Sequence, residues 1–170
     1  VGIQRSLDIL ERADVKGTFF VNGSTVDMFP DSVLDIHRRG HEIAAHGHVA
    51  EDLWKLSEEE ECALIRNARA GIAKLTGTRP SGWLSPRARQ SERTMRLLAE
   101  QEFMWNTDMF DSELPYVVEI AGRSMIELPR SFSADDIMMP HDDPRAMYQA
   151  WKDEFDFLYA ESARAPRMLV

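Results

Sequence analysis

Short apolar runs and amphipathic helical patterns alternate along the whole chain, and this alternation limits the fold more than any other feature. Ile3, Leu7 and Leu10 recur at the spacing of one helix face, and the run from Lys16 to Val21 then has the composition of a buried strand. Similar patterns predict helices over 30–39, 57–76, 91–100 and 144–158, and strands over 42–45, 81–84, 103–105, 125–129 and 168–170. Strands that alternate with helices are typically parallel, because each helix returns the chain to the starting edge of the sheet. We therefore expect an α/β domain, built either as an open sheet or as a barrel.

Composition and charge exclude several classes of partner. The chain has 170 residues, of which 44% are hydrophobic, as in an ordinary soluble globular domain. Its formal net charge of -9 argues against nucleic acid and against an anionic membrane surface, since both require a basic face. No apolar run approaches the length of a bilayer span. The single cysteine, Cys62, falls in a helical pattern that predicts a buried or half-buried thiol, and it fits a reducing compartment, so we expect a cytoplasmic location.

Four predicted loops follow strands and carry polar or rigid residues. They cover 22–25, 46–52, 83–87 and 106–111, and the last continues to Tyr116 within an irregular stretch of roughly 107–123. A long irregular stretch in a compact domain usually has a function. If the strands are parallel, all four loops emerge at one edge of the sheet, where they would line a cleft for a small molecule.

The segment from Gly40 to His48 ends in two histidines just after a predicted strand. A histidine at that place can bind a metal or transfer a proton near neutral pH. Both histidines can equally be ordinary polar loop residues, because short motifs are weak without structural context. The pair by itself therefore leaves the two interpretations open.

The remaining loop residues also have two interpretations each. Asn22-Gly23 is interpreted as turn chemistry, because both residues tolerate left-handed backbone. Trp83 fits the core and the wall of a cleft equally well. Asp108 and Asp111 are either solvated loop acids or carboxylates of the cleft. The acidic run over 58–61 suits the positive end of a helix and is given no further role.

Four segments together resemble the polysaccharide deacetylase (NodB-homology) family, nearest to its branch of allantoinase-like small-molecule amidohydrolases. They are Val15–Gly23, Gly40–Gly47, Leu75–Trp83 and Leu114–Tyr116. The resemblance implies a distorted (β/α) barrel that hydrolyses a carbon–nitrogen amide bond, either in N-acetylated sugars of chitin or peptidoglycan or in small cyclic amides such as allantoin. It implies that residues 1–170 form a single catalytic domain, seen here without the family's first strand, which carries an aspartate motif, and without its end, which carries a late histidine.

Two departures from the family pattern bear on the chemistry. The family places a second metal-binding histidine four residues after the first, and that position is Ala50 here, so the resemblance marks His46 as a ligand and leaves His48 as a substitute. The family's arginine after the third-motif aromatic is Leu84 here, and Arg87 is close enough in sequence to supply the charge. Catalytic zinc requires three protein ligands and an open position. Zinc or another divalent metal and a metal-independent reaction therefore both stay open.

We expect a hydrolase that acts on carbon–nitrogen bonds of non-peptide amides, with a small molecule or an N-acetylated sugar as its substrate. Catalytic roles are predicted for His46 and Asp108, as a proton carrier and an orienting acid. Substrate-binding roles are predicted for Trp83, Ser85, Arg87, Asp111 and Tyr116. The alternative is an inactive module of the same fold that binds a glycan or a small metabolite. The sequence leaves assembly into a homo-oligomer open.

Overall fold

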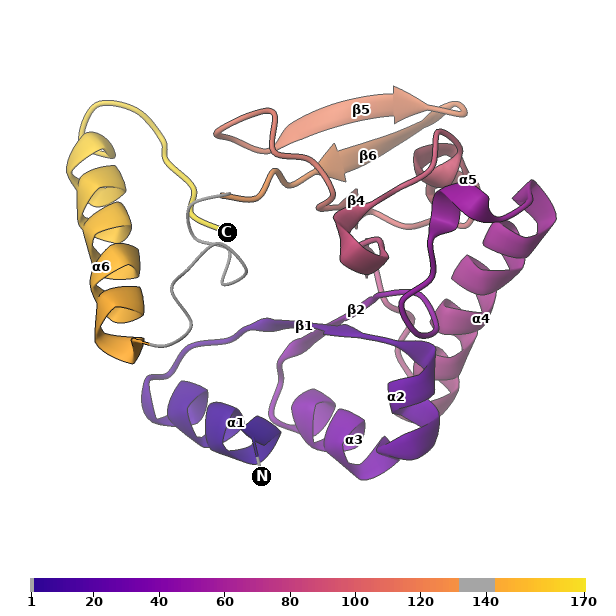
Figure 1. Ribbon diagram of the computed structural model, residues 1–170, viewed down its shortest axis with the longest axis horizontal. Coiled ribbons are helices and arrows are strands. Elements are labelled where there is room, and N and C mark those ends of the chain that lie inside the picture. The colour runs from indigo at the N-terminus through magenta and orange to yellow at the C-terminus, as the bar shows by residue number, and fades with distance from the viewer. Residues whose placement is uncertain (1, 132–142) are drawn as a thin grey trace.

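The computed structural model describes residues 2–131 and 143–170 (Figure 1). Along these residues the helices are α1 (Gly2–Arg12), α2 (Gly23–Met28), α3 (Pro30–Arg38), α4 (Glu58–Thr76), α5 (Thr94–Glu100) and α6 (Pro144–Glu161). The strands are β1 (Thr18–Val21), β2 (Glu42–Ala45), β3 (Gly82–Trp83), β4 (Trp105–Asn106), β5 (Tyr116–Ile120) and β6 (Arg123–Glu127). Two short 3₁₀ turns, η1 (Leu53–Lys55) and η2 (Pro86–Ala88), follow β2 and β3.

The strands form one sheet in the order β1-β2-β3-β4-β6-β5. The pairs from β1 to β6 are parallel, whereas β5 is antiparallel to β6. The expectation of an α/β domain with parallel strands is therefore confirmed for most of the sheet. The described strands form an open sheet, and β1 and β5 are its two edges.

Three predicted elements differ from the structure. The irregular stretch of 107–123 is shorter than expected, because Tyr116–Ile120 is strand β5 and pairs with β6 in a hairpin. The segment 22–25 is more than a turn, since helix α2 begins at Gly23. The predicted strand over 168–170 is wrong: this segment is irregular, and the carbonyl oxygen of Val170 accepts a hydrogen bond from the backbone N–H of Ser131 (3.1 Å).

A hydrophobic core lies between the sheet and a layer of helices. Helices α1, α3, α4 and α5 contact one another in that order, and Figure 1 shows α1 and α3 beside β1 and β2, and α5 beside β4 and β6. Alternate strand residues point into this core, together with apolar residues of the helices: Val21, Ile43, Trp83, Met125, Leu7, Val33, Ile65, Ile72, Leu97 and Leu98. Burial of these side chains is the main favourable term in folding. The opposite face of the sheet carries exposed side chains, among them Phe20 and Val117.

The middle of the sheet depends on a close approach at Gly82. A Cβ atom on Gly82 would lie 1.9 Å from the indole ring of Trp105 on the neighbouring strand, so only glycine fits there. The indole Nε1 of Trp105 donates a hydrogen bond to Glu42 on β2 (3.2 Å). The side chain of Trp105 thus lies across β3 and joins β4 to β2.

The ends of the long helix α4 follow the sequence signals. Ser57 accepts a hydrogen bond from the backbone of Glu60, and the Glu60 carboxylate accepts one from the backbone of Ser57, which is the reciprocal capping box expected from Ser-x-x-Glu. Gly77 ends the helix with a φ of 77°, a left-handed conformation that glycine adopts without strain.

Helix α6 differs from the others in its packing. It begins after Asp143, whose carboxylate accepts hydrogen bonds from the N–H groups of Arg145 (2.9 Å) and Ala146 (3.3 Å). None of its residues is buried, and Figure 1 shows it apart from the helix layer, on the other side of the sheet. Among the described residues, no helix is both long enough and apolar enough to cross a bilayer.

Candidate functional site

The segments that follow β2, β3 and β4 meet at one edge of the sheet. The imidazole Nδ1 of His46, just after β2, lies 2.7 Å from the carbonyl oxygen of Leu84, just after β3. Ser85 in turn contacts Asp108, which follows β4, through both its backbone and its side chain. Residues 46, 84, 85 and 108 therefore lie side by side, and we refer to residues 46, 84 and 85 as the rim. The expectation that parallel strands bring these loops together is confirmed.

The contact with Leu84 determines which nitrogen of His46 carries the proton. A carbonyl oxygen can only accept a hydrogen bond, so Nδ1 must donate, and the neutral ring then has its lone pair on Nε2. His46 is half-buried, and its ring lies 6.3 Å from the ring of Phe20. This arrangement leaves Nε2 as the basic nitrogen, the atom that can accept a proton or coordinate a cation.

Asp108 holds the β3 loop in place from below the rim. One carboxylate oxygen accepts from the backbone N–H of Ser85 (2.7 Å) and the other from its hydroxyl (2.6 Å). Asp108 is 5% exposed, and burial raises the pKa of its carboxyl group, although the two hydrogen bonds from Ser85 act in the opposite direction. A carboxyl group with a raised pKa beside a polar rim is a candidate for a functional role.

Glu127, at the end of β6, is a second buried carboxylate at this edge. It accepts hydrogen bonds from the side-chain amide of Asn106 (3.1 Å) and from the backbone N–H of Met109 (3.1 Å). Burial raises its pKa, and the negative charges of Asp108 and Asp111 add to the effect. Sequence reasoning missed this residue. An acid within the apolar run 125–128 was the signal that could have found it, because a buried charge requires partners.

The structure does not support direct substrate contact by Trp83 or Ser85, which are both fully buried. Trp83 packs edge-on against Phe103 in the core, with ring centroids 5.8 Å apart, because the strand alternation points its side chain toward the helices. Its indole N–H donates to the hydroxyl of Ser85 (3.0 Å), and that hydroxyl donates to Asp108. Both residues thus support the carboxylate of Asp108.

The loop after Ser85 is strained. Arg87 and Ala88 have φ values of 59° and 52°, a left-handed conformation that is uncommon for residues with a side chain. Pro86 lies against Gly47, where a Cβ atom would be 2.6 Å from the proline ring. The exposed guanidinium of Arg87 lies 3.6 Å from the carboxylate of Asp52. Arg87 therefore stands at the border of the rim, and its substrate-binding role stays a prediction.

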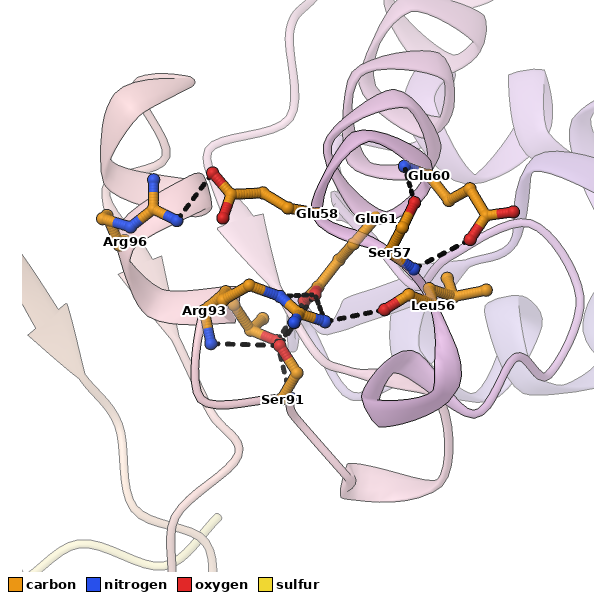
Figure 2. A network of polar contacts seen from close by, with 9 residues as sticks. Leu56, Ser57, Glu58, Glu60, Glu61, Ser91, Arg93 and Arg96 are labelled. Carbon is orange, nitrogen blue, oxygen red and sulfur yellow. Dashed lines mark hydrogen bonds and ion pairs between the residues drawn. The ribbon is translucent and has the colours of Figure 1, made fainter.

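A buried polar cluster fixes the other end of this loop (Figure 2). Glu61 on α4 is fully buried, and its carboxylate accepts hydrogen bonds from the hydroxyls of Ser91 (2.7 Å) and Thr94 (2.5 Å) and pairs with Arg93 (3.3 Å). Arg93 also donates to the carbonyl oxygen of Leu56 (2.8 Å). The acidic run lies in the first turn of α4, as expected, but Glu61 also has a role that the sequence analysis did not give it, because it is buried against residues 91–94.

Asp111 and Tyr116 form a separate contact beyond the rim. The phenol of Tyr116 donates to the carboxylate of Asp111 at 2.9 Å from one of its oxygens. Burial and the neighbouring carboxylate raise the pKa of Tyr116 to about 12, so the phenol keeps its proton at neutral pH. Asp111 is exposed and Tyr116 half-buried, and the substrate-binding roles of both stay predictions.

The two histidines of the β2 loop contact different segments. The Nδ1 atom of His48 lies 2.6 Å from the place of a Cβ on Gly23, at the start of α2, whereas His46 faces Leu84. With its amide rotated, Asn22 donates to the carbonyl oxygens of Val49 (2.8 Å) and His46, so its side chain joins the start of α2 to the β2 loop, and its extended backbone does not have the left-handed conformation expected of a turn.

A metal centre does not fit the part of the chain that the structure describes. Residues 2–131 and 143–170 contain no group of three or more histidine, cysteine, aspartate or glutamate side chains that could hold an ion. His46 and His48 alone do not supply the three ligands that a catalytic zinc requires. The roles derived below therefore use the protons and hydrogen bonds of this chain's own residues.

Comparison with known proteins gives a consistent family. The family model described as polysaccharide deacetylase matches residues 2–104. The peptidoglycan deacetylase-like protein FGM2 of Gibberella zeae is 31% identical over 86% of this chain and 44% of its own length. The peptidoglycan deacetylase of Helicobacter pylori is 24% identical over 95% of this chain and 67% of its own length. The crystal structure of Puue allantoinase superposes on 99% of this chain with a TM-score of 0.90 and 29% identity. The chain spans 57% of that allantoinase chain. The crystal structure of a probable polysaccharide deacetylase from Pseudomonas aeruginosa superposes on 99% of this chain with a TM-score of 0.90, so the fold is of the deacetylase type.

Proposed function

Because the chain belongs to the polysaccharide deacetylase family, we propose that the full-length protein hydrolyses a carbon–nitrogen bond in a non-peptide amide. The observation that carries this proposal is the hydrogen bond from His46 to the carbonyl of Leu84, because it presents a basic nitrogen at the edge where loops of three strands meet. Active sites of folds with parallel strands lie at this edge.

His46 acts in the proposed reaction as the group that moves the proton. Its Nε2 removes a proton from the attacking water, or returns one to the leaving nitrogen, while Nδ1 stays bonded to Leu84. Proton transfer by a positioned side chain contributes roughly 10²–10⁴-fold to a rate. The catalytic role of His46 is carried over from the sequence prediction.

Asp108 acts in this proposal through the backbone rather than on the substrate. Its carboxylate fixes Ser85, and the preceding residue Leu84 carries the carbonyl that orients His46. A displacement of about 1 Å at a reacting group can reduce a rate roughly a hundredfold, so such support matters. Asp108 is thus a positioning residue, and the exposed Arg87, whose guanidinium lies near Asp52, is available to bind a polar group of the substrate.

The substrate follows from two kinds of relative. Relatives named as peptidoglycan deacetylases favour an N-acetylated sugar, and the structural similarity to an allantoinase favours a small cyclic amide. The full-length protein should be incubated with N-acetylglucosamine oligomers and, separately, with allantoin, while released acetate and opened ureide are measured. Product from one of these substrates would assign the substrate class. If neither substrate reacted faster with the protein than in buffer alone, the proposal would be contradicted.

A second function is favoured by one observation. Ala50 stands where the family pattern has a metal-binding histidine, and the described residues hold no three-ligand group. An inactive module of the same fold that binds a glycan or metabolite would have this pattern. Saturable binding of an N-acetylglucosamine oligomer without acetate release, in the presence of added zinc, would favour this second function.

A further inference from the structure

A cavity of about 340 Å³ lies at the opposite end of the strands from the rim. One wall is the α4 face that carries Cys62, Arg66 and Arg69. The other wall comes from Arg79, which precedes β3, and from residues 100–102, which precede β4. Because these segments enter the strands whereas the rim segments leave them, the cavity and the rim are separate places.

The cavity gathers three arginines in an acidic protein. The chain has 29 acidic and 20 basic side chains, yet none of Arg66, Arg69 and Arg79 makes an ion pair among residues 2–131 and 143–170. Two carboxylates on the border of the cavity are paired with other cations. Glu100 pairs with Arg96 (2.9 Å), and Glu102 pairs with Arg123 (3.8 Å). The three guanidinium groups therefore face the cavity region with an excess of positive charge.

Arg69 is held rigidly at the base of this group. It donates to the carbonyl oxygens of Gln101 and Glu102, and its guanidinium lies 5.1 Å from the ring centroid of Phe103. Its Nε–H is buried and has no hydrogen-bond partner in the described structure. Buried donors are nearly always satisfied in proteins, so an unsatisfied donor beside a cavity indicates a missing acceptor.

The electrostatics of the group point the same way. Burial lowers the pKa of Arg69, and the positive charge of Arg79 lowers it further, whereas the carboxylate of Glu102 acts in the opposite direction. The like charges of Arg69 and Arg79 thus repel one another, Glu102 offsets part of that repulsion, and a bound anion would reduce it further.

We propose that this cavity binds a tetrahedral oxyanion, as presented by a phosphate group, with Arg66 and Arg79 as its ligands from the exposed side and Arg69 donating to it through the Nε–H that otherwise has no partner in the described structure. Guanidinium groups match such anions because their planar N–H donors form paired hydrogen bonds to two oxygens. The volume lies within the range of roughly 300–1,000 Å³ that small-molecule pockets occupy, so there is room for a sugar-sized group attached to the phosphate. The site does not depend on the proposed hydrolase activity.

Calorimetric titration of the full-length protein at low salt tests this proposal with three probes: inorganic phosphate, glucose 6-phosphate and glucose. We expect both phosphates to bind and glucose not to bind. Binding of glucose 6-phosphate at least threefold tighter than that of phosphate would assign a phosphate ester, and equal affinities would assign the free anion. No heat from either phosphate would overturn the proposal.

A pair of variants locates the site. Arg66→Gln combined with Arg79→Gln should weaken binding of either phosphate at least tenfold, while Arg5→Gln, an exposed arginine on α1, should leave the affinity unchanged. Arg66 and Arg79 are exposed, so their replacement should leave the melting temperature within a few degrees of the parent. Equal affinity in the double variant and the Arg5→Gln protein would also overturn the proposal, because the anion would then bind elsewhere.

Discussion

Two buried carboxylates, Glu61 and Asp108, are held by different kinds of partner. The carboxylate of Glu61 contacts a guanidinium and two hydroxyls drawn from the start of α5, so its charge is balanced where it is buried (Figure 2). The carboxylate of Asp108 accepts its hydrogen bonds from the neutral amide and hydroxyl of Ser85. Glu61 faces the packed start of a helix, and Asp108 supports the rim.

Because of this difference, we assign Glu61 a role in stability and Asp108 a role in function, although the two residues hold opposite ends of one loop. Residues 85–91 run from the Asp108 contact to the Glu61 cluster, with two left-handed residues between them. Removal of a buried carboxylate that is paired with a cation is strongly destabilising, because it leaves the cation and the hydroxyls without an acceptor. A buried carboxyl group with a raised pKa costs stability when it ionises, a cost typical of functional positions. We therefore expect changes at Glu61 to affect unfolding and changes around Asp108 to affect turnover.

The largest effect should come from Glu61→Ala. It removes the acceptor of Ser91, Thr94 and Arg93 together, and we expect it to lower the free energy of unfolding by about 3 kcal/mol. Urea denaturation measures this value. Glu59→Ala, an exposed neighbour on the same helix, should cost far less. If both variants lost similar amounts, the cluster would have no special role in stability.

His46→Ala tests the functional side of the comparison. Without the imidazole the rim has lost its proposed proton carrier, so turnover should fall about a hundredfold, within the range of general acid–base catalysis. The melting temperature should stay nearly unchanged, because His46 is only half-buried. His48→Ala serves as the matched control. A comparable loss of turnover in the control would mean that the two histidines act together, as in the predicted metal pair.

Asp108→Asn should have a smaller effect on the reaction, and that effect should fall on kcat rather than on KM. The amide keeps an acceptor for the N–H of Ser85 but loses the acceptor for its hydroxyl, so Leu84 and His46 shift slightly. We expect kcat to fall about tenfold, which corresponds to about 1.4 kcal/mol, with little change in KM. Steady-state kinetics separates the two constants. A rate that matches the parent would remove Asp108 from the support of His46.

The smallest effect is the pH dependence of stability at Asp108. Its pKa is raised in the folded protein, so the folded state binds the proton more tightly than the unfolded state does. Its contribution to stability is therefore fully present below the ordinary pKa of 3.8 and is lost as the pH rises through the raised value. The stability of Asp108→Asn relative to the parent should thus increase as the pH rises from about 4 to 7. Denaturation series at several pH values measure this trend, and a difference that stays constant with pH would contradict it.

Much of the sheet could be predicted from the sequence, and the missed hairpin shows why the rest could not. The turn between β5 and β6 consists of Ala121 and Gly122, with φ values of 52° and 71°. Turns of this kind normally carry Asn-Gly or Asp-Gly, because both residues need left-handed backbone. Because the first position is alanine, the sequence lacks the Asn-Gly or Asp-Gly pair that predicts a hairpin, and the pattern indicates an irregular stretch instead.

The candidate site was predictable in position but not in detail. Strand order brought His46, Ser85 and Asp108 to one edge, as expected from parallel strands. The burial of Trp83 and Glu61 was not readable, because both depend on contacts with residues 20–33 positions away in the chain. Local sequence reports the spacing of side chains along one element, whereas burial depends on which elements pack against it.

The hydrogen bond between His46 and Leu84 has a consequence for how the protein tolerates mutation. The acceptor is a main-chain oxygen, and every amino acid supplies one at that position. The side chain of residue 84 can therefore change without altering which ring nitrogen of the histidine holds its hydrogen. Only a displacement of the backbone can move the hydrogen to the other ring nitrogen, so the tautomer of His46 is insensitive to substitutions at position 84.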